Sequence, residues 1–232
     1  MPAGEATTAQ SVTRSLLPAN NPPVKSSRFF IMRHGETVYN AARRLQANDI
    51  HTPLTRLGCE QAAAMGEALR GALGHMPNVT LHISETGRAL QTAALIAEEL
   101  GIDWFAARRS HDLREIDMGS WCGRTYDDVQ AELGPIVTAD HLLRPAPDGE
   151  DYPDIAARLN NWLASVAHNG RDHLVVMHGI SSRVLRGLMA GYPAHPVYGV
   201  PIAPSLMQGS VTLIENGAES VFLGASRGTE HA

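Results

Sequence analysis

The sequence predicts an α/β fold, a three-layer α/β/α sandwich on a mainly parallel sheet with an antiparallel edge. From Arg28 onward, apolar runs typical of strands alternate with stretches whose apolar residues recur at helical spacing, the pattern of a sheet covered on both faces. The last two apolar runs are separated only by ENGAES, a hairpin signal that predicts an antiparallel pair at the C-terminal edge. A chain of 232 residues suits one such domain.

Five short apolar runs are the predicted strands. In chain order they are RFFIMR (28–33), VTLHIS (79–84), HLVVMH (173–178), VTLIEN (211–216) and SVFLGA (220–225). Each is rich in β-branched or aromatic residues and is bounded by polar residues, glycine or proline.

Four helices are predicted between and beside these strands. Thr55 can cap the first, the second follows Thr86, and the third has Pro153 in its first turn. The fourth spans Ile180 to Ala190 and ends at Gly191. The predicted inward residues are Leu57, Ala64, Met65, Ala68 and Leu69 in the first helix, and Leu90, Ala93, Ala94 and Ala97 in the second.

Composition limits the classes of partner and the compartment. With a formal net charge of -5, nothing indicates nucleic acid or an anionic membrane, so an anionic substrate needs a local cluster of cations. Cys59 and Cys122 lack the spacing of a disulfide framework or a zinc site, and no apolar run is long enough to cross a bilayer. We expect a cytoplasmic protein with no cofactor.

Three regions are predicted along the chain. Residues 1–27 lack the apolar core of a signal peptide and form a flexible N-terminal extension, with a short transit sequence as the alternative. Residues 28–226 form the single domain, and residues 227–232 form a tail.

Charged and polar residues follow three of the predicted strands. The first strand delivers Arg33 and His34, the second is followed by Arg88 in the first turn of a helix, and the third delivers His178 before Gly179. In open parallel sheets, ligands bind beyond the carboxyl ends of strands, so these side chains are expected to converge. A strand followed by His-Gly occurs twice, which core or surface histidines do not explain.

Five motifs resemble those of the histidine phosphatase superfamily, also called the phosphoglycerate mutase-like family. They are RHGET, PLTRLGCEQA, SETGRALQTA, LREIDMGSWCGRTYDDV and VVMHGISSRVLRGL, and they occur in this order between residue 28 and about residue 216. The resemblance implies a phosphoglycerate mutase-like fold with a phosphate pocket at the carboxyl edge of the sheet. It also implies a phosphohistidine intermediate and no metal.

The chemistry of phosphoryl transfer gives roles to the residues at the strand ends. Arg33 and Arg88 can each offer a planar fork of donors to phosphate oxygens, and His178 adds a third cation if the phosphate's field protonates it. His34 is the expected nucleophile, with one ring nitrogen held by a backbone hydrogen bond and the other aimed at phosphorus. Gly35 is expected to permit the bend that lets Arg33 and His34 share one pocket.

The resemblance implies the remaining site residues. It makes Asn40 a donor to the phosphate, and the start of the last helix adds Gly179 to the binding set. It also places the carboxyl group that serves first as acid and then as base at Glu115, with Asp112 and Asp117 as nearby rivals. The role of Glu150 in PDGED stays open, since the family usually has Ser in place of Asp151. The family also often has Gly in place of Ala47.

Three functions are compatible with these residues. The leading hypothesis is a phosphatase that acts on a small phosphorylated metabolite, because the stretch from Glu115 to His178 is short and mutases of the family carry a long closing insertion there. The alternatives are a cofactor-dependent phosphoglycerate mutase and a protein that only binds phosphorylated ligands. The apolar C-terminal strands leave a homodimer open.

Overall fold

The computed structural model describes residues 27–47, 49–166 and 170–223. The predicted extension therefore lies outside the described residues except for Ser27. The predicted tail and the last two residues of the predicted final strand also lie outside them.

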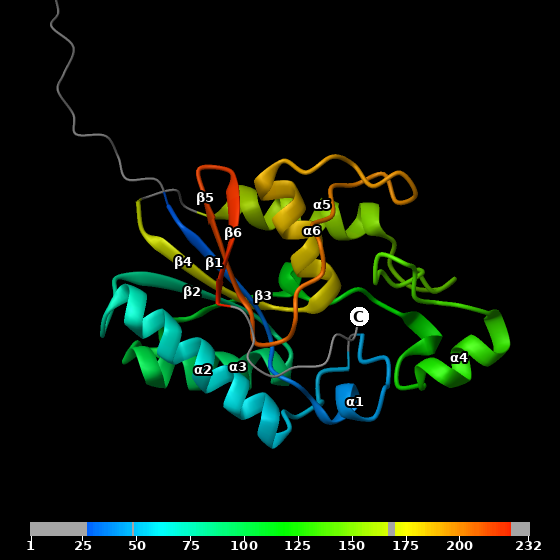
Figure 1. The fold of residues 1–232 in the computed structure, drawn as a ribbon, viewed down its shortest axis with the longest axis horizontal. Coiled ribbons are helices and arrows are strands. Elements are labelled where there is room, and N and C mark those ends of the chain that lie inside the picture. Colours follow the sequence, from blue (N-terminus) through cyan, green and yellow to red (C-terminus); the bar gives the residue numbers. More distant parts are fainter. Residues whose placement is uncertain (1–26, 48, 167–169, 224–232) are drawn as a thin grey trace, which may run out of the picture.

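A six-stranded sheet forms the middle layer, in the order β3-β2-β4-β1-β5-β6 (Figure 1). The strands β1, β4, β2 and β3 are parallel to their neighbours, whereas β5 pairs antiparallel with both β1 and β6. The bounds are β1 Phe29–Arg33, β2 Val79–Ser84, β3 Arg108–Ser110, β4 Asp172–Met177, β5 Val211–Glu215 and β6 Ala218–Leu223. The predicted fold class is confirmed, with the antiparallel pair at one edge.

Helices cover both faces of this sheet (Figure 1). The pair α2 (Arg56–Leu73) and α3 (Gly87–Leu100) covers one face, and α5 (Tyr152–Ser165) and α6 (Gly179–Ala190) cover the other. Successive residues of β1 point to opposite faces, so Phe30 and Met32 join the core with α2 and α3, while Phe29 and Ile31 join the other core. The shorter elements are α1 Val38–Ala41, α4 Tyr126–Leu133, and the 3-10 turns η1 Trp104–Ala106, η2 His111–Leu113 and η3 Gly119–Trp121.

Local signals account for most element boundaries. The Thr55 hydroxyl accepts from the Gly58 amide at the start of α2, and Gly191 ends α6 in the left-handed conformation. In the β5–β6 hairpin, Asn216 and Gly217 have φ of 53° and 75°, which suits a tight two-residue turn. The predicted inward residues Ala64 and Ala94 are wrong, since both are exposed.

Two histidines, His82 and His173, belong to the core under α5. They lie on neighbouring strands, each 2% exposed, with Nε2 of His82 3.1 Å from Nδ1 of His173. The His173 ring stacks on Phe29 and the edge of the Trp162 ring system meets His82. Burial, with a smaller effect of His173, lowers the pKa of His82 to about 3, so its ring is neutral in the folded protein.

No helix in the described parts of the chain combines the length and the apolar character needed to span a membrane.

Candidate active site

One hollow at the carboxyl edge of the sheet brings the predicted residues together. Arg33, His34, Asn40, Arg88 and Glu115 all line it, although they come from five separate stretches of sequence. The His178 ring lies beside that of His34, with 5.2 Å between the ring centroids. The predicted convergence of two histidines and two arginines is therefore present.

His34 is held in the tautomer that nucleophilic attack requires. Its Nδ1 lies 2.8 Å from the carbonyl oxygen of Gly35, and because a carbonyl only accepts, Nδ1 carries the proton and Nε2 has a free lone pair. The residue is 2% exposed, and burial lowers its pKa well below the ordinary value, with Arg88 and Arg33 adding to the effect. The neutral, nucleophilic form is thus the stable one near neutral pH.

Gly35 is needed for a different reason from the one the sequence suggested. Its φ is not in the left-handed region, so backbone freedom does not explain it. A Cβ at Gly35 would lie 2.2 Å from the carbonyl oxygen of Gly58, and one at Gly58 would lie 2.0 Å from that of Glu36. The two glycines therefore permit the turn after β1 to pack directly on the first turn of α2.

Gly179 creates space for a cation rather than for a turn. A Cβ at Gly179 would lie 3.2 Å from the guanidinium carbon of Arg33, tighter than ordinary contacts. Burial lowers the pKa of Arg33, while the nearby carboxylate of Glu115 acts in the opposite direction. Arg33 thus lies against the start of α6, where the backbone amides also favour anions.

Arg88 does not offer the predicted fork of donors. Its Nη1 donates to the Asp49 carbonyl at 2.6 Å and the Thr52 hydroxyl at 3.0 Å, and its Nη2 donates to the Ala47 carbonyl at 2.8 Å. Its Nε donates to Nδ1 of His178 at 3.3 Å. Since an arginine has five N–H groups, one remains for a ligand. The prediction overlooked the carbonyl groups of the loop before α2, which no sequence pattern indicates.

His178 is neutral in this environment. Arg88 can only donate, so Nδ1 of His178 accepts and Nε2 carries the proton, 2.7 Å from the Ser84 hydroxyl oxygen. Burial lowers the pKa of His178 well below its ordinary value, with Arg88 next in importance and His34 after it. The protein alone does not make His178 a third cation; an added anionic charge would have to raise its pKa.

Asn40 presents its amide N–H groups to the hollow. Its Oδ1 accepts from the backbone amide of Thr37 and from Nε2 of Gln208, both at 3.1 Å, so the oxygen side is occupied by the protein. The Thr37 hydroxyl caps α1 and lies 2.8 Å from Oε1 of Gln46, which also lines the hollow. Sequence reasoning missed Gln46 and Gln208, which lie in irregular segments.

Glu115 is the carboxylate that lines the hollow, and its rivals lie elsewhere. Its oxygens accept from the amides of Ile180 at 3.1 Å and Ser181 at 2.9 Å, at the start of α6. Asp112 and Asp117 are not among the lining residues, and Asp117 instead accepts from the Gly119 amide. Geometry therefore favours Glu115.

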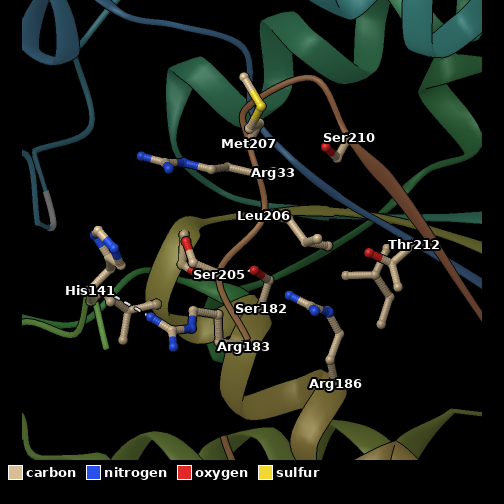
Figure 2. Close-up of a pocket in the computed structure, with 13 residues that line it drawn as sticks. Arg33, His141, Ser182, Arg183, Arg186, Ser205, Leu206, Met207, Ser210 and Thr212 are labelled. Atoms are coloured by element: carbon tan, nitrogen blue, oxygen red, sulfur yellow. Dashed lines mark hydrogen bonds between the residues drawn. The ribbon is translucent and has the colours of Figure 1, made fainter. Parts of the chain in front are cut away.

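A second hollow lies on the other side of Arg33, along one face of α6 (Figure 2). Arg183 and Arg186 line it, but both are engaged in holding the fold. Arg183 donates to two backbone carbonyls, one of them that of His141 at 2.8 Å, and Arg186 pairs with Glu219 at 2.5 Å. We interpret the positive charge here as structural, and the hollow around His34 as the candidate active site.

The fold and this arrangement define a histidine-dependent phosphoryl-transfer protein, and the comparisons agree. Residues 29–222 match the histidine phosphatase superfamily (branch 1), and the chain belongs to this family. A Citrobacter koseri protein described as "Probable phosphoglycerate mutase GpmB" is 37% identical over 174 residues, which cover 71% of this chain and 75% of that protein.

Solved structures extend the comparison to named phosphatases. Bacillus stearothermophilus YhfR is 28% identical with a TM-score of 0.68, and the match covers 84% of this chain and 95% of that one. A mycobacterial glucosyl-3-phosphoglycerate phosphatase is 25% identical with a TM-score of 0.64, covering 82% and 90%. Family membership supports an enzyme with phosphatase or mutase activity, and the relatives carry both descriptions.

Proposed function

We propose that the protein is a phosphatase that hydrolyses a small phosphorylated metabolite through a phosphohistidine on His34. The observation that carries the proposal is the tautomer of His34, fixed by Gly35, inside a hollow lined by Arg33 and Arg88. A buried neutral imidazole is a competent nucleophile, and fixed cations stabilise the charge on the transferring phosphoryl group.

In the first step, Nε2 of His34 forms a bond to phosphorus as the bond from phosphorus to the ester oxygen breaks. The electron pair of that bond stays on the leaving oxygen, which takes a proton from the carboxyl group of Glu115 and departs as an alcohol. The proton on Nδ1 stays in its hydrogen bond to Gly35 throughout.

In the second step, the carboxylate of Glu115 takes a proton from water, and the water oxygen attacks phosphorus. The N–P bond breaks, its electrons return to Nε2 of His34, and inorganic phosphate leaves. The sum is hydrolysis of one phosphomonoester, with the enzyme unchanged.

We propose that these steps need no metal ion, because Arg33 and Arg88 supply the positive charge that Mg²⁺ supplies in many phosphoryl-transfer enzymes. Activity that is unchanged after treatment with EDTA would support this. Activity that is lost with EDTA and restored by Mg²⁺ would contradict it.

The second candidate, a cofactor-dependent phosphoglycerate mutase, is favoured by the 37% identity to a protein of that description. It would use the same residues and return the phosphoryl group to another substrate oxygen instead of water. The two are distinguished by measuring phosphate release and the interconversion of 2- and 3-phosphoglycerate in the same sample. Interconversion without phosphate release would overturn the phosphatase.

The intermediate is tested with a ³²P-labelled phosphomonoester and rapid acid-free denaturation. We expect a label on the protein that is stable in alkali, labile in acid and absent from His34→Gln. A protein without label or turnover on any phosphomonoester would instead be one that only binds phosphorylated ligands. A cytoplasmic location, a homodimer and the boundaries of the terminal extensions stay predictions.

A further inference from the structure

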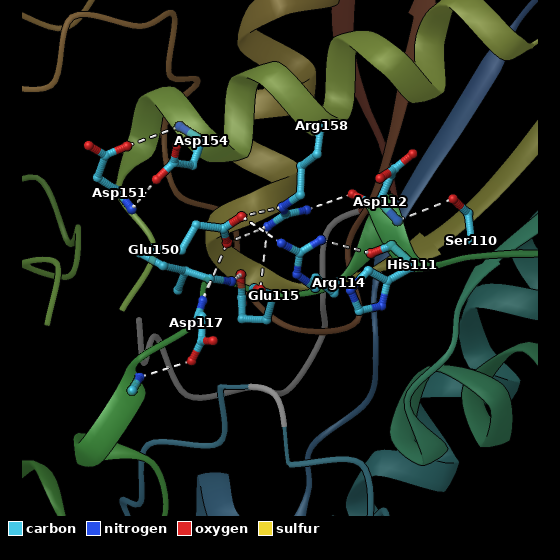
Figure 3. A network of polar contacts seen from close by, with 12 residues as sticks. Ser110, His111, Asp112, Arg114, Glu115, Asp117, Glu150, Asp151, Asp154 and Arg158 are labelled. Carbon is cyan, nitrogen blue, oxygen red and sulfur yellow. Dashed lines mark hydrogen bonds and ion pairs between the residues drawn. The ribbon is translucent and has the colours of Figure 1, made fainter. Parts of the chain in front are cut away.

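A buried ion pair lies behind the candidate acid, between Glu150 and Arg158 of α5 (Figure 3). Nε of Arg158 donates to Oε1 of Glu150 at 2.6 Å and Nη2 donates to Oε2 at 2.9 Å, a bidentate pair. Both side chains are 7% exposed. Neither residue lines the hollow around His34, so the pair does not touch a substrate there.

The pair is bonded to the backbone on both sides of Glu115. Arg158 donates to the carbonyl oxygens of Asp112 at 2.6 Å and of Glu115 at 3.4 Å. Glu150 accepts from the Asp117 amide at 3.4 Å, and the Glu150 amide donates to the Asp117 carbonyl at 2.9 Å.

The same carboxylate also fixes the side chain next to the candidate acid. Nη2 of Arg114 lies 3.1 Å from Oε1 of Glu150. As Figure 3 shows, the two arginines approach this carboxylate together, Arg158 from α5 and Arg114 from the loop.

The loop that carries Glu115 has little other support. It connects η2, which ends at Leu113, to η3, which begins at Gly119, and it lies outside the strands and helices. A carboxylate in such a loop must be held within fractions of an ångström to protonate a leaving oxygen, and misplacement by about 1 Å can cost about 10²-fold in rate.

Stability alone explains a buried ion pair poorly. Removing two charges from water is costly, and apolar residues of similar volume often stabilise a protein equally well or better. Here the donors and acceptors left over from the pair are directed to one short loop.

We propose that Glu150 and Arg158 are positioning residues that hold the carboxyl group of Glu115 against the leaving oxygen. This inference rests on the proposed function, since it assumes that Glu115 is the general acid. It also gives a role to Glu150, which the sequence left open.

The leaving group of the substrate provides the test. An alkyl phosphate expels a strongly basic alkoxide and depends on the acid, whereas p-nitrophenyl phosphate expels a weak base and depends on it little. We expect Arg158→Lys and Glu150→Gln to lower kcat/KM for an alkyl phosphate by about 10- to 100-fold. For p-nitrophenyl phosphate we expect a loss below about threefold, and Glu115→Gln should show the same contrast more strongly.

The pair between Arg186 and Glu219 supplies the matched control. It is equally buried, with side chains 4% and 9% exposed, and it lies away from the hollow around His34. Arg186→Lys should therefore show no contrast between the two substrates. Adding Arg158→Lys to Glu115→Gln should cost little more than Glu115→Gln alone, because the two residues act on one step.

Equal losses on both substrates, with a lowered melting temperature, would overturn the proposal and leave the pair a purely structural role. Should Arg158→Lys fail to fold, Arg114→Gln removes one contact to Glu150 from a partly exposed side chain and must show the same contrast. Failure of the wild-type protein to turn over either substrate would refute the proposed function instead.

Discussion

The replacement Arg88→Ala removes the cation that contacts both the candidate histidine pair and the loop before α2. Its four hydrogen bonds join His178, Thr52 and the carbonyls of Ala47 and Asp49. Removing one preorganised donor from the transition state typically costs about 10²- to 10³-fold in kcat. We therefore expect at least about a 10²-fold loss in kcat/KM.

The variant should also shift the pH profile. Arg88 is second to burial among the causes that lower the pKa of His34 and of His178. Without this cation both pKa values rise, so the acid limb of kcat/KM moves to higher pH. The measurement is the steady-state rate from pH 5 to 9, with folding checked by urea denaturation.

Arg183→Ala is the control for this variant. Arg183 is a buried arginine that also donates to two backbone carbonyls, but it faces the second hollow. It should lose stability with less than about a threefold change in rate, as expected for a group that makes no transition-state contact. A rate loss under threefold in Arg88→Ala, or an acid limb that stays in place, would refute the reasoning.

Three further predictions concern stability and binding. For His82, whose pKa falls to about 3 in the folded protein, the unfolded state binds the extra proton between about pH 6.5 and 3, so stability decreases as pH falls through this range. His82→Gln should abolish about 2 kcal/mol of the loss between pH 7 and pH 5 in urea denaturation, whereas the exposed His75→Gln should not. Ala47, with φ of 43°, should become less strained as glycine, and Ala47→Gly should gain about 0.5–1 kcal/mol; a destabilised variant would contradict this. Sulfate should bind more tightly as pH falls, because a fixed dianion opposes the lowered pKa values of His34 and His178; calorimetry showing no proton uptake would contradict this.

The sequence predicted the elements that carry strong local signals. The apolar runs that became β1, β2 and β4 are buried, and the turn at Asn216 has the backbone conformation its residue pair favours. The strand β3 was missed because Arg108–Ser110 is short and polar, and only its pairing with β2 makes it a strand. An edge strand of this kind is determined by tertiary contacts.

The site was predicted at the level of residue types but not of their partners. Strand ends predict which side chains converge, because the carboxyl ends of parallel strands meet at one edge. They do not predict that loop carbonyls take most of the donors of Arg88, or that Gln208 occupies the oxygen of Asn40. Such contacts depend on the path of irregular loops, which has no periodic signature.

The electrostatics of the hollow point to the charge of its ligand. Burial lowers the pKa of Arg88 to about 10 and also lowers the pKa of Arg33, and the two cations in turn lower the pKa of His34. Each shift means that the site holds more positive charge than the single carboxylate of Glu115 balances. A phosphate dianion would offset that excess and so stabilise the charged arginines. An overall negative protein with a locally positive hollow thus selects for anions at this position, which a neutral or cationic substrate would not satisfy.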